Sequence, residues 1–278
     1  MRLRGVRGSR NIEDRRRSGG GKGAQIGGVG LLVVLAIGYF AGIDVTPLLQ
    51  QGGAPQQSQP RELSAQEEQA GAFAAQVLTT TEGVWSDIFP KAFGREYTPP
   101  TLVLFADVTQ SPCGGASGAT GPFYCPADRK AYLDTAFFAT MQQQLGAGGD
   151  FAAAYVIAHE VAHHVQNELG ILGKVNQQRQ RASQTDANAL TVRLELQADC
   201  LSGVWARAVG GLMERGDLAE ALNAAKQIGD DTLQRRAGRV PQPHTFTHGT
   251  SAQRQRWFKA GFDSGDPNVC DTFGTRRL

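Results

Sequence analysis

The chain has 278 residues, with 28 Lys and Arg against 26 Asp and Glu, and 41% of its residues are hydrophobic. This length suffices for one domain with a hydrophobic core. Residues 1–23 hold eight of the basic residues and two of the acidic ones, so 20 basic and 24 acidic residues leave the remainder at a net charge of −4. That balance, with basic residues that do not alternate with aromatic ones, excludes nucleic acid as the partner.

An uncharged stretch follows the basic segment. Residues 25–43 are nineteen mainly apolar residues without a charge, which is just enough for a helix that spans a bilayer. The arginine-rich flank predicts a cytoplasmic N-terminus. A cleaved signal peptide is the alternative, but its charged region would be unusually long and no clear A-x-A site follows. We therefore expect a basic cytoplasmic segment (1–23), a transmembrane anchor in the lipid bilayer (24–43), a flexible linker (44–63) and an exported domain (64–278).

The exported part reads as a predominantly helical α+β domain with a small sheet. Ser64 and Glu67 form a capping box that opens a helix running toward residue 79. Residues 101–106 and 130–134 are predicted strands, and the second is either an edge strand that receives substrate or a packed strand. Further helices are expected at 134–145, 150–169, 186–209, 217–228 and 250–262.

Four cysteines lie in the expected exported domain. An even number in an oxidising compartment favours two disulfides. The most economical pairing joins Cys113 to Cys125 and Cys200 to Cys270, although the sequence leaves the other pairings open. A cysteine-based metal site would need C-x-x-C spacing, which this chain lacks.

The most specific motif is H-E-x-x-H, in helix 150–169. His159 and His163 are four residues apart, so both rings face one side of a helix and can bind one metal ion. Glu160 stands beside that ion without binding it, where a carboxylate can accept a proton from water activated by zinc. The alternative is a pair of core histidines with Glu160 in a salt bridge, but the spacing favours a zinc site.

A catalytic zinc ion needs a third protein ligand. The metzincin extension would require Gly at 166 and His at 169, where this chain has Gln166 and Leu169. Helix 186–209 offers Glu195 as the ligand and, four residues later, Asp199 to hold the free N–H of a liganding histidine. An exposed acidic helix face is the alternative, but apolar residues surround both acids.

Peptide hydrolysis also needs a donor that stabilises the developing oxyanion. His248 is the first candidate, with Tyr132 and His244 behind it, although a surface role for His248 stays open. His164 points about 140° away from His159 around the helix, so we expect it to be structural.

Several segments together resemble a known bacterial family. The chain is similar to the neutral zinc metallopeptidases, which are single-pass membrane proteins assigned to the zincin-like, gluzincin-type enzymes. The resemblance rests on segments 11–16, 121–126, 154–166, 195–200, 247–251 and 270–273. It implies a zincin-like fold, a bacterial cell-membrane location and one Zn²⁺ ion held by His159, His163 and Glu195, with Glu160 as the base. It names no substrate.

Three functions remain open at this point. The preferred one is a zinc metallopeptidase that acts on a peptide or protein. The second is a non-catalytic envelope module, stabilised by zinc, that binds another protein. The third is a zinc amidase that acts on cell-wall material.

Overall fold

The first long helix begins as the sequence predicts. The computed structural model describes residues 1–17, 61–117 and 121–278. In α3 (Ala65–Phe93), the Ser64 side chain accepts a hydrogen bond from the Glu67 N–H, and the Glu67 carboxylate accepts one from the Ser64 N–H. The helix continues well beyond residue 79 because its second half buries large apolar side chains, among them Trp85 and Phe89.

Two sheets are present in the described residues. The larger sheet has the order β1-β2-β6-β5, in which β1, β2 and β6 are parallel and β5 is antiparallel to β6. Strand β6 pairs with β2 on one side and with β5 on the other, so it is a packed strand and β5 is the edge strand. The strands are β1 (Ile12–Asp14), β2 (Thr101–Phe105), β5 (Phe123–Cys125) and β6 (Lys130–Asp134), with a separate hairpin of β3 (Val108–Ser111) and β4 (Gly114–Ser117).

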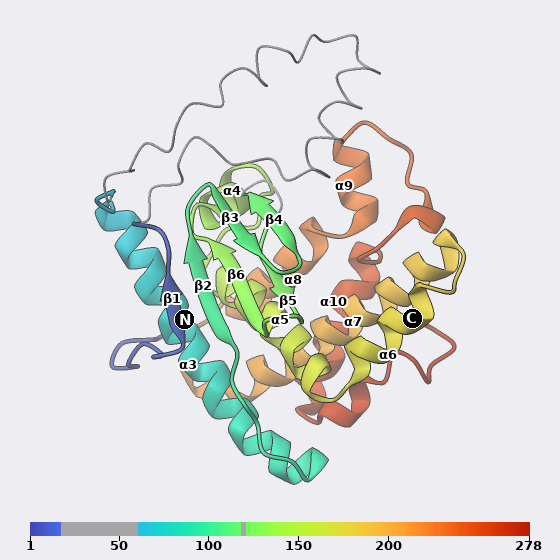
Figure 1. The fold of residues 1–278 in the computed structure, drawn as a ribbon, viewed down its shortest axis with the longest axis horizontal. Helices are drawn as coiled ribbons and strands as arrows, with labels where there is room; N and C mark the ends of the chain where they lie inside the picture. The colour runs from blue at the N-terminus through green and yellow to red at the C-terminus, as the bar shows by residue number, and fades with distance from the viewer. Residues whose placement is uncertain (18–60, 118–120) are drawn as a thin grey trace.

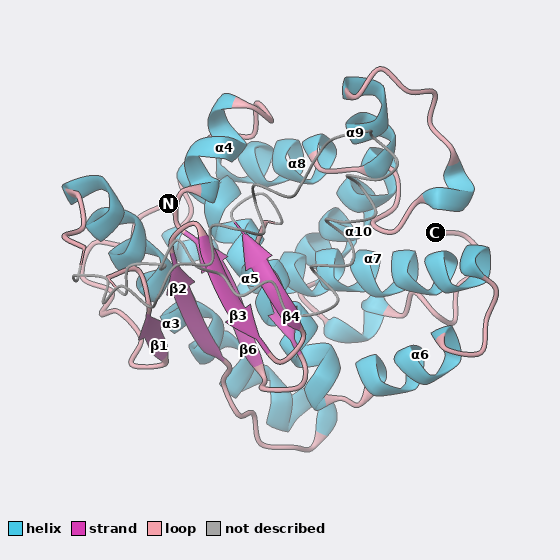
Figure 2. Cartoon of the chain, turned by 45° about the horizontal axis from the view of Figure 1, so that its top comes forward, coloured by secondary structure: helices cyan, strands magenta, loops and turns pink. Residues whose placement is uncertain are grey.

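Most of the domain is helical. Helix α5 is buried along nearly its whole length and lies between the larger sheet and α7 (Figure 2). Helices α7 and α10 cross very closely, since a Cβ atom on Gly261 would lie 1.9 Å from the Cys200 carbonyl oxygen. The remaining helices are α4 (Phe137–Gln143), α5 (Asp150–Glu168), α6 (Ile171–Arg179), α7 (Gln184–Ala208), α8 (Asp217–Gln227), α9 (Asp230–Arg236) and α10 (Ser251–Ser264).

The predicted membrane helix and membrane location need correction. Among the described residues, no helix has the length and apolar character to cross a bilayer, and residues 24–43 lie outside them. Most of the predicted linker, residues 44–60, also lies outside the described residues. The fold that the structure supports is a predominantly helical α+β domain with small sheets.

The N-terminal segment, predicted to be a separate cytoplasmic part, packs against the rest of the domain. Strand β1 lies beside β2 (Figure 1) and pairs with it, and Met1 and Leu3 belong to the hydrophobic core. The Arg17 carbonyl oxygen accepts a hydrogen bond of 3.0 Å from the Arg61 N–H, so both ends of segment 18–60 lie together. Strand β1, from the predicted cytoplasmic segment, therefore belongs to the same sheet as β2, from the predicted exported domain.

Candidate metal centre

Helix α5 carries the first part of the site. Its sequence from Phe151 to Gln166 is rich in Ala and Val and free of Gly and Pro, which favours a helix that can be buried on all sides. His159 and His163 project from one side of it, and their ring centroids are 4.8 Å apart. Their polar rings therefore need partners inside the domain.

Helix α7 supplies the partner. Glu195 Oε2 lies 3.1 Å from His159 Nε2, and Glu195 Oε1 lies 3.4 Å from His163 Nε2. One donor atom from each of the three residues lies within 4.8 Å of the other two. The structure thus brings together the three residues that the sequence predicts as zinc ligands.

Asp199 lies on the other side of the His159 ring. Its Oδ1 atom is 3.0 Å from His159 Nδ1, and the carboxylate is fully buried. Since a carboxylate oxygen only accepts, Nδ1 carries a hydrogen toward Asp199, and Nε2 is the ring nitrogen that faces Glu195. This is the position that the sequence predicts for Asp199.

Two further residues that bind Asp199, Arg254 and Tyr155, were not predicted from the sequence. The Arg254 guanidinium, from α10, donates to both Asp199 oxygens at 2.9 Å. The Tyr155 hydroxyl donates to Asp199 Oδ1 at 2.5 Å. An arginine on an amphipathic helix and a tyrosine in an apolar helix carry no pattern that signals such a role, so only the packing of α5, α7 and α10 identifies them.

The charges around His159 favour a cation. Burial lowers the pKa of His159, but Asp199 and Glu195 outweigh that effect and raise the pKa to about 10. Burial raises the pKa of Glu195, yet the nearby histidines bring the pKa well below its usual range. The two carboxylates therefore favour a positive charge at this point of the site, which suits a metal cation.

A cavity of about 530 Å³ opens onto these residues. Glu160, His159, His163 and Glu195 line it, and so does His248. Its other walls are mainly apolar and come from several elements: Pro122, Phe123, Phe137, Leu145, Val156, Leu172, Leu194, Ile228 and Leu233. A volume of this size is in the range of ligand-binding clefts.

His248 reaches the cavity from the loop before α10. Asp230 holds that loop, because its Oδ2 atom accepts backbone N–H bonds from Thr247, His248 and Gly249 at 2.6–2.9 Å. The His248 Nδ1 atom lies 3.4 Å from Asp230 Oδ1. Burial lowers the pKa of His248, but the Asp230 carboxylate outweighs it and raises the pKa above its ordinary value.

The other candidates lie elsewhere. Tyr132 is not among the residues that line the cavity: its hydroxyl donates to Asp128, and its ring stacks on the wall residue Phe123. His244 is also outside that lining. His164 faces away from the metal ligands, with its Nδ1 2.9 Å from the Tyr124 hydroxyl and its Nε2 2.6 Å from the Thr98 carbonyl oxygen.

Both predicted disulfides are present. Cys113 is bonded to Cys125 at the end of the edge strand β5, and Cys200 is bonded to Cys270. The second bond ties the C-terminal segment to α7, five residues after Glu195.

Two histidines and a glutamate around one point, with a further carboxylate beside them, define the class of site found in zinc hydrolases. The chain belongs to the family described as "Putative neutral zinc metallopeptidase", whose family model matches residues 1–273. The resemblance noted from the sequence motifs is thereby confirmed. The family implies zinc and, at the general level, a peptide or protein substrate.

Relatives match over most of the chain. It is 50% identical over 289 residues to "Uncharacterized protein YpfJ" of Escherichia coli strain K12, with 99% of each chain covered. It is 42% identical over 212 residues to "Uncharacterized protein Rv2575" of Mycobacterium tuberculosis strain H37Rv, which covers 72% of this chain and 69% of that protein. No solved structure matches this chain.

Proposed function

We propose that this chain is a zinc-dependent peptidase with one zinc ion held by His159, His163 and Glu195. The observation that carries the proposal is that their donor atoms lie within 4.8 Å of one another in a cavity that Glu160 also lines. Two imidazole nitrogens and one carboxylate oxygen are a donor set that zinc prefers. Both rings use Nδ1 for other hydrogen bonds, so both Nε2 atoms are available to the metal.

Glu160 is the proposed general base. When bound, zinc polarises a carbonyl group and makes water more acidic. The Glu160 carboxylate takes a proton from water as the water oxygen bonds to the peptide carbonyl carbon. It then gives that proton to the leaving nitrogen as the C–N bond breaks. Burial raises the pKa of Glu160 despite the nearby histidines, and a raised pKa helps it to hold the proton between these steps.

His248 is the proposed donor to the oxyanion. Its ring lines the same cavity as Glu160. The three backbone N–H groups that bind Asp230 hold the loop, and the Asp230 carboxylate favours the protonated, donating form of the imidazole. These contacts support a ring that is preorganised toward the cavity, as transition-state stabilisation requires.

The edge strand β5 is the proposed support for the substrate backbone. Phe123 and Tyr124 belong to β5 and line the cavity. In the described residues β5 pairs only with β6, so its outer edge can bind an extended peptide as an added strand. This arrangement favours a peptide over a compact small molecule.

A peptide library tests the proposal. The purified full chain, verified to carry one zinc ion, is incubated with mixed peptides beside a Glu160→Gln variant, and new termini are mapped by mass spectrometry. We expect cleavage by the wild type, and Glu160→Gln to keep its zinc while cleavage falls about 10²–10⁴-fold. Glu168→Gln is the matched control, because Glu168 lies on the same helix but pairs with Arg129 outside the cavity lining.

The other outcomes separate the alternatives. A zinc-loaded wild type that leaves peptides intact but cleaves cell-wall fragments would overturn the peptidase in favour of an amidase. Zinc binding without cleavage of either substrate would favour a non-catalytic binding module. A folded chain that binds no zinc would overturn the metal site itself.

A further inference from the structure

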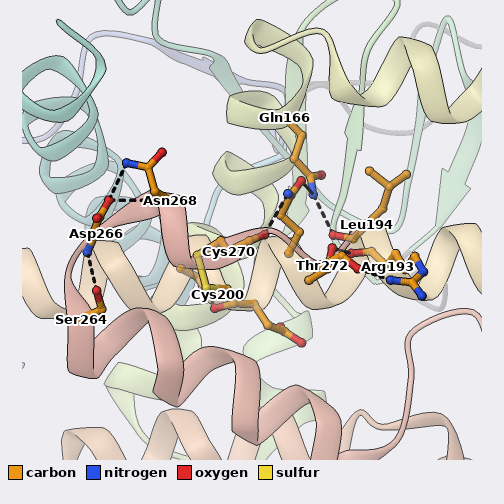
Figure 3. Close-up of a disulfide and its surroundings, with 12 residues drawn as sticks. Gln166, Arg193, Leu194, Cys200, Ser264, Asp266, Asn268, Cys270 and Thr272 are labelled. Atoms are coloured by element: carbon orange, nitrogen blue, oxygen red, sulfur yellow. Dashed lines mark hydrogen bonds between the residues drawn. A yellow bond between two sulfur atoms is a disulfide. The ribbon is translucent and has the colours of Figure 1, made fainter. Parts of the chain in front are cut away.

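We propose that Gln166 is a positioning residue that locks His163 to the α7 backbone beside Glu195, through an amide chain that ends at the C-terminal segment. The inference rests on the proposed zinc site. Gln166 Oε1 lies 2.9 Å from His163 Nδ1. Gln166 Nε2 lies 2.8 Å from the Leu194 carbonyl oxygen (Figure 3). Gln166 thus contacts the proposed ligand His163 and also Leu194, the residue before the proposed ligand Glu195.

The direction of every bond in this chain follows from chemistry. The Leu194 carbonyl can only accept, so the NH₂ group of Gln166 faces it and the amide oxygen faces His163. His163 must then donate from Nδ1, which leaves Nε2, on the side of Glu195, as the nitrogen that can bind a metal ion. The ring orientation and the tautomer that a metal ligand needs are both set by Gln166.

The same reasoning extends the chain by one residue. The second hydrogen of the Gln166 NH₂ group goes to Gln197 Oε1 at 3.1 Å. The NH₂ group of Gln197 donates to the Cys270 carbonyl oxygen at 2.9 Å. The NH₂ group of each glutamine donates to a backbone carbonyl oxygen, which can only accept. Flipping either amide would therefore place two oxygens against each other.

Burial makes this chain effective. Gln166 is 0% exposed and Gln197 is 7% exposed. A buried amide that loses a partner cannot replace it with bulk water, so each bond is costly to break. Because water cannot replace a lost bond, its loss should move the side chains that Gln166 and Gln197 contact.

The C-terminal segment, residues 270–275, anchors the far end of the chain. Its Cys270 is bonded to Cys200, and Thr272 Oγ1 donates to the Arg193 carbonyl oxygen at 2.7 Å (Figure 3). The Arg193 guanidinium donates to the Thr275 carbonyl oxygen at 3.1 Å. These attachments lie on both sides of Glu195 in the sequence of α7, so the segment fixes the part of the helix that carries this ligand.

The two histidines are therefore held in different ways. His159 donates to the charged carboxylate of Asp199, whereas His163 donates to the neutral amide of Gln166. A neutral acceptor orients the ring without adding another negative charge to a site that already holds Glu195 and Asp199.

Zinc affinity tests the inference without any substrate. Gln166→Met and Gln197→Met keep the length of the side chain and remove its hydrogen bonds, and affinity is measured by competition with a chelating dye. We expect Gln166→Met to weaken zinc binding about 10–100-fold and Gln197→Met to weaken it less. The double variant should bind no more weakly than Gln166→Met, because Gln197 acts through Gln166.

The matched control is Gln255→Met, which removes a bond of 3.0 Å to the Leu222 carbonyl oxygen away from the site. It should leave zinc affinity unchanged. The visible spectrum of the cobalt-substituted protein should change for Gln166→Met and stay unchanged for Gln255→Met. That readout separates a positioning role from a general loss of stability.

Wild-type affinity in Gln166→Met and Gln197→Met would overturn the inference, even if both variants unfold more easily. If Gln166→Met does not fold, an unchanged affinity of Gln197→Met has the same meaning. A wild type that binds no zinc would instead overturn the proposed function, so the two failures are distinguishable.

Discussion

Arg254→Met is the most informative perturbation of stability, because it breaks a buried ion pair on one side. The Arg254 guanidinium is 2% exposed and binds both oxygens of Asp199, which is 0% exposed. The same guanidinium donates to the Tyr155 hydroxyl at 3.2 Å and to the Ile228 carbonyl oxygen at 3.3 Å. The variant would remove all of these bonds; of the side-chain partners of Asp199 in the described part of the chain, His159 and Tyr155 would remain.

The expected cost in unfolding free energy is about 3–5 kcal/mol, the usual range when one partner of a buried pair is removed. Most of this cost arises because the buried Asp199 carboxylate keeps its charge without the Arg254 guanidinium, rather than from the lost attraction between the two groups. Arg254→Met combined with Asp199→Asn should therefore cost clearly less than the sum of the two single changes, with a coupling of about 2 kcal/mol or more.

Urea unfolding of the metal-free protein at pH 7 measures these differences. Arg256→Met is the control on the same helix, since Arg256 is exposed, and we expect it to change the unfolding free energy by less than about 0.5 kcal/mol. A loss below about 1 kcal/mol for Arg254→Met, or additive effects in the double variant, would refute the view that Arg254 stabilises the Asp199 charge.

The same unfolding assay tests two further predictions. Replacing both Cys200 and Cys270 with alanine should cost about 4 kcal/mol because the bond spans 70 residues, against about 3 kcal/mol for Cys113 and Cys125, which are 12 residues apart; a smaller loss for the longer loop would contradict this. Burial lowers the pKa of His164 to about 4 from 6.5, so the unfolded chain binds a proton there that the folded chain does not. As pH falls from about 6.5 to 4, stability should drop by about 3 kcal/mol through this group, and a His164→Gln variant should lack that part of the decline; parallel pH profiles would show that His164 does not contribute.

Local patterns predicted the helical part of the molecule well. The capping box at Ser64, the apolar helix around His159 and the acidic pair on α7 all depend on spacing within one helix. Spacing of this kind is visible in the sequence because i and i+4 residues share a face. The pairing of the cysteines was also correct, since it follows the shortest separations.

The N-terminal segment shows where local patterns mislead. Arginines beside an apolar run indicated a membrane flank, but Arg15 pairs with Glu13 and Arg16 with Asp14 in the folded chain. Strand β1 has three residues and gains its place from pairing with β2, about 90 residues later. A short strand with no turn signal cannot be recognised without its partner.

The sequence by itself determined the chemistry of the candidate site: two histidines one helical turn apart, a glutamate next to the first, and two acids at the same spacing on a later helix. Only the tertiary structure decided which groups hold those residues. Arg254 and Tyr155 bind Asp199 on another helix, and Gln166 joins His163 on its own helix to Leu194 on α7; burial gives these bonds their strength. Contacts between distant segments leave no spacing to read, so packing alone reveals them.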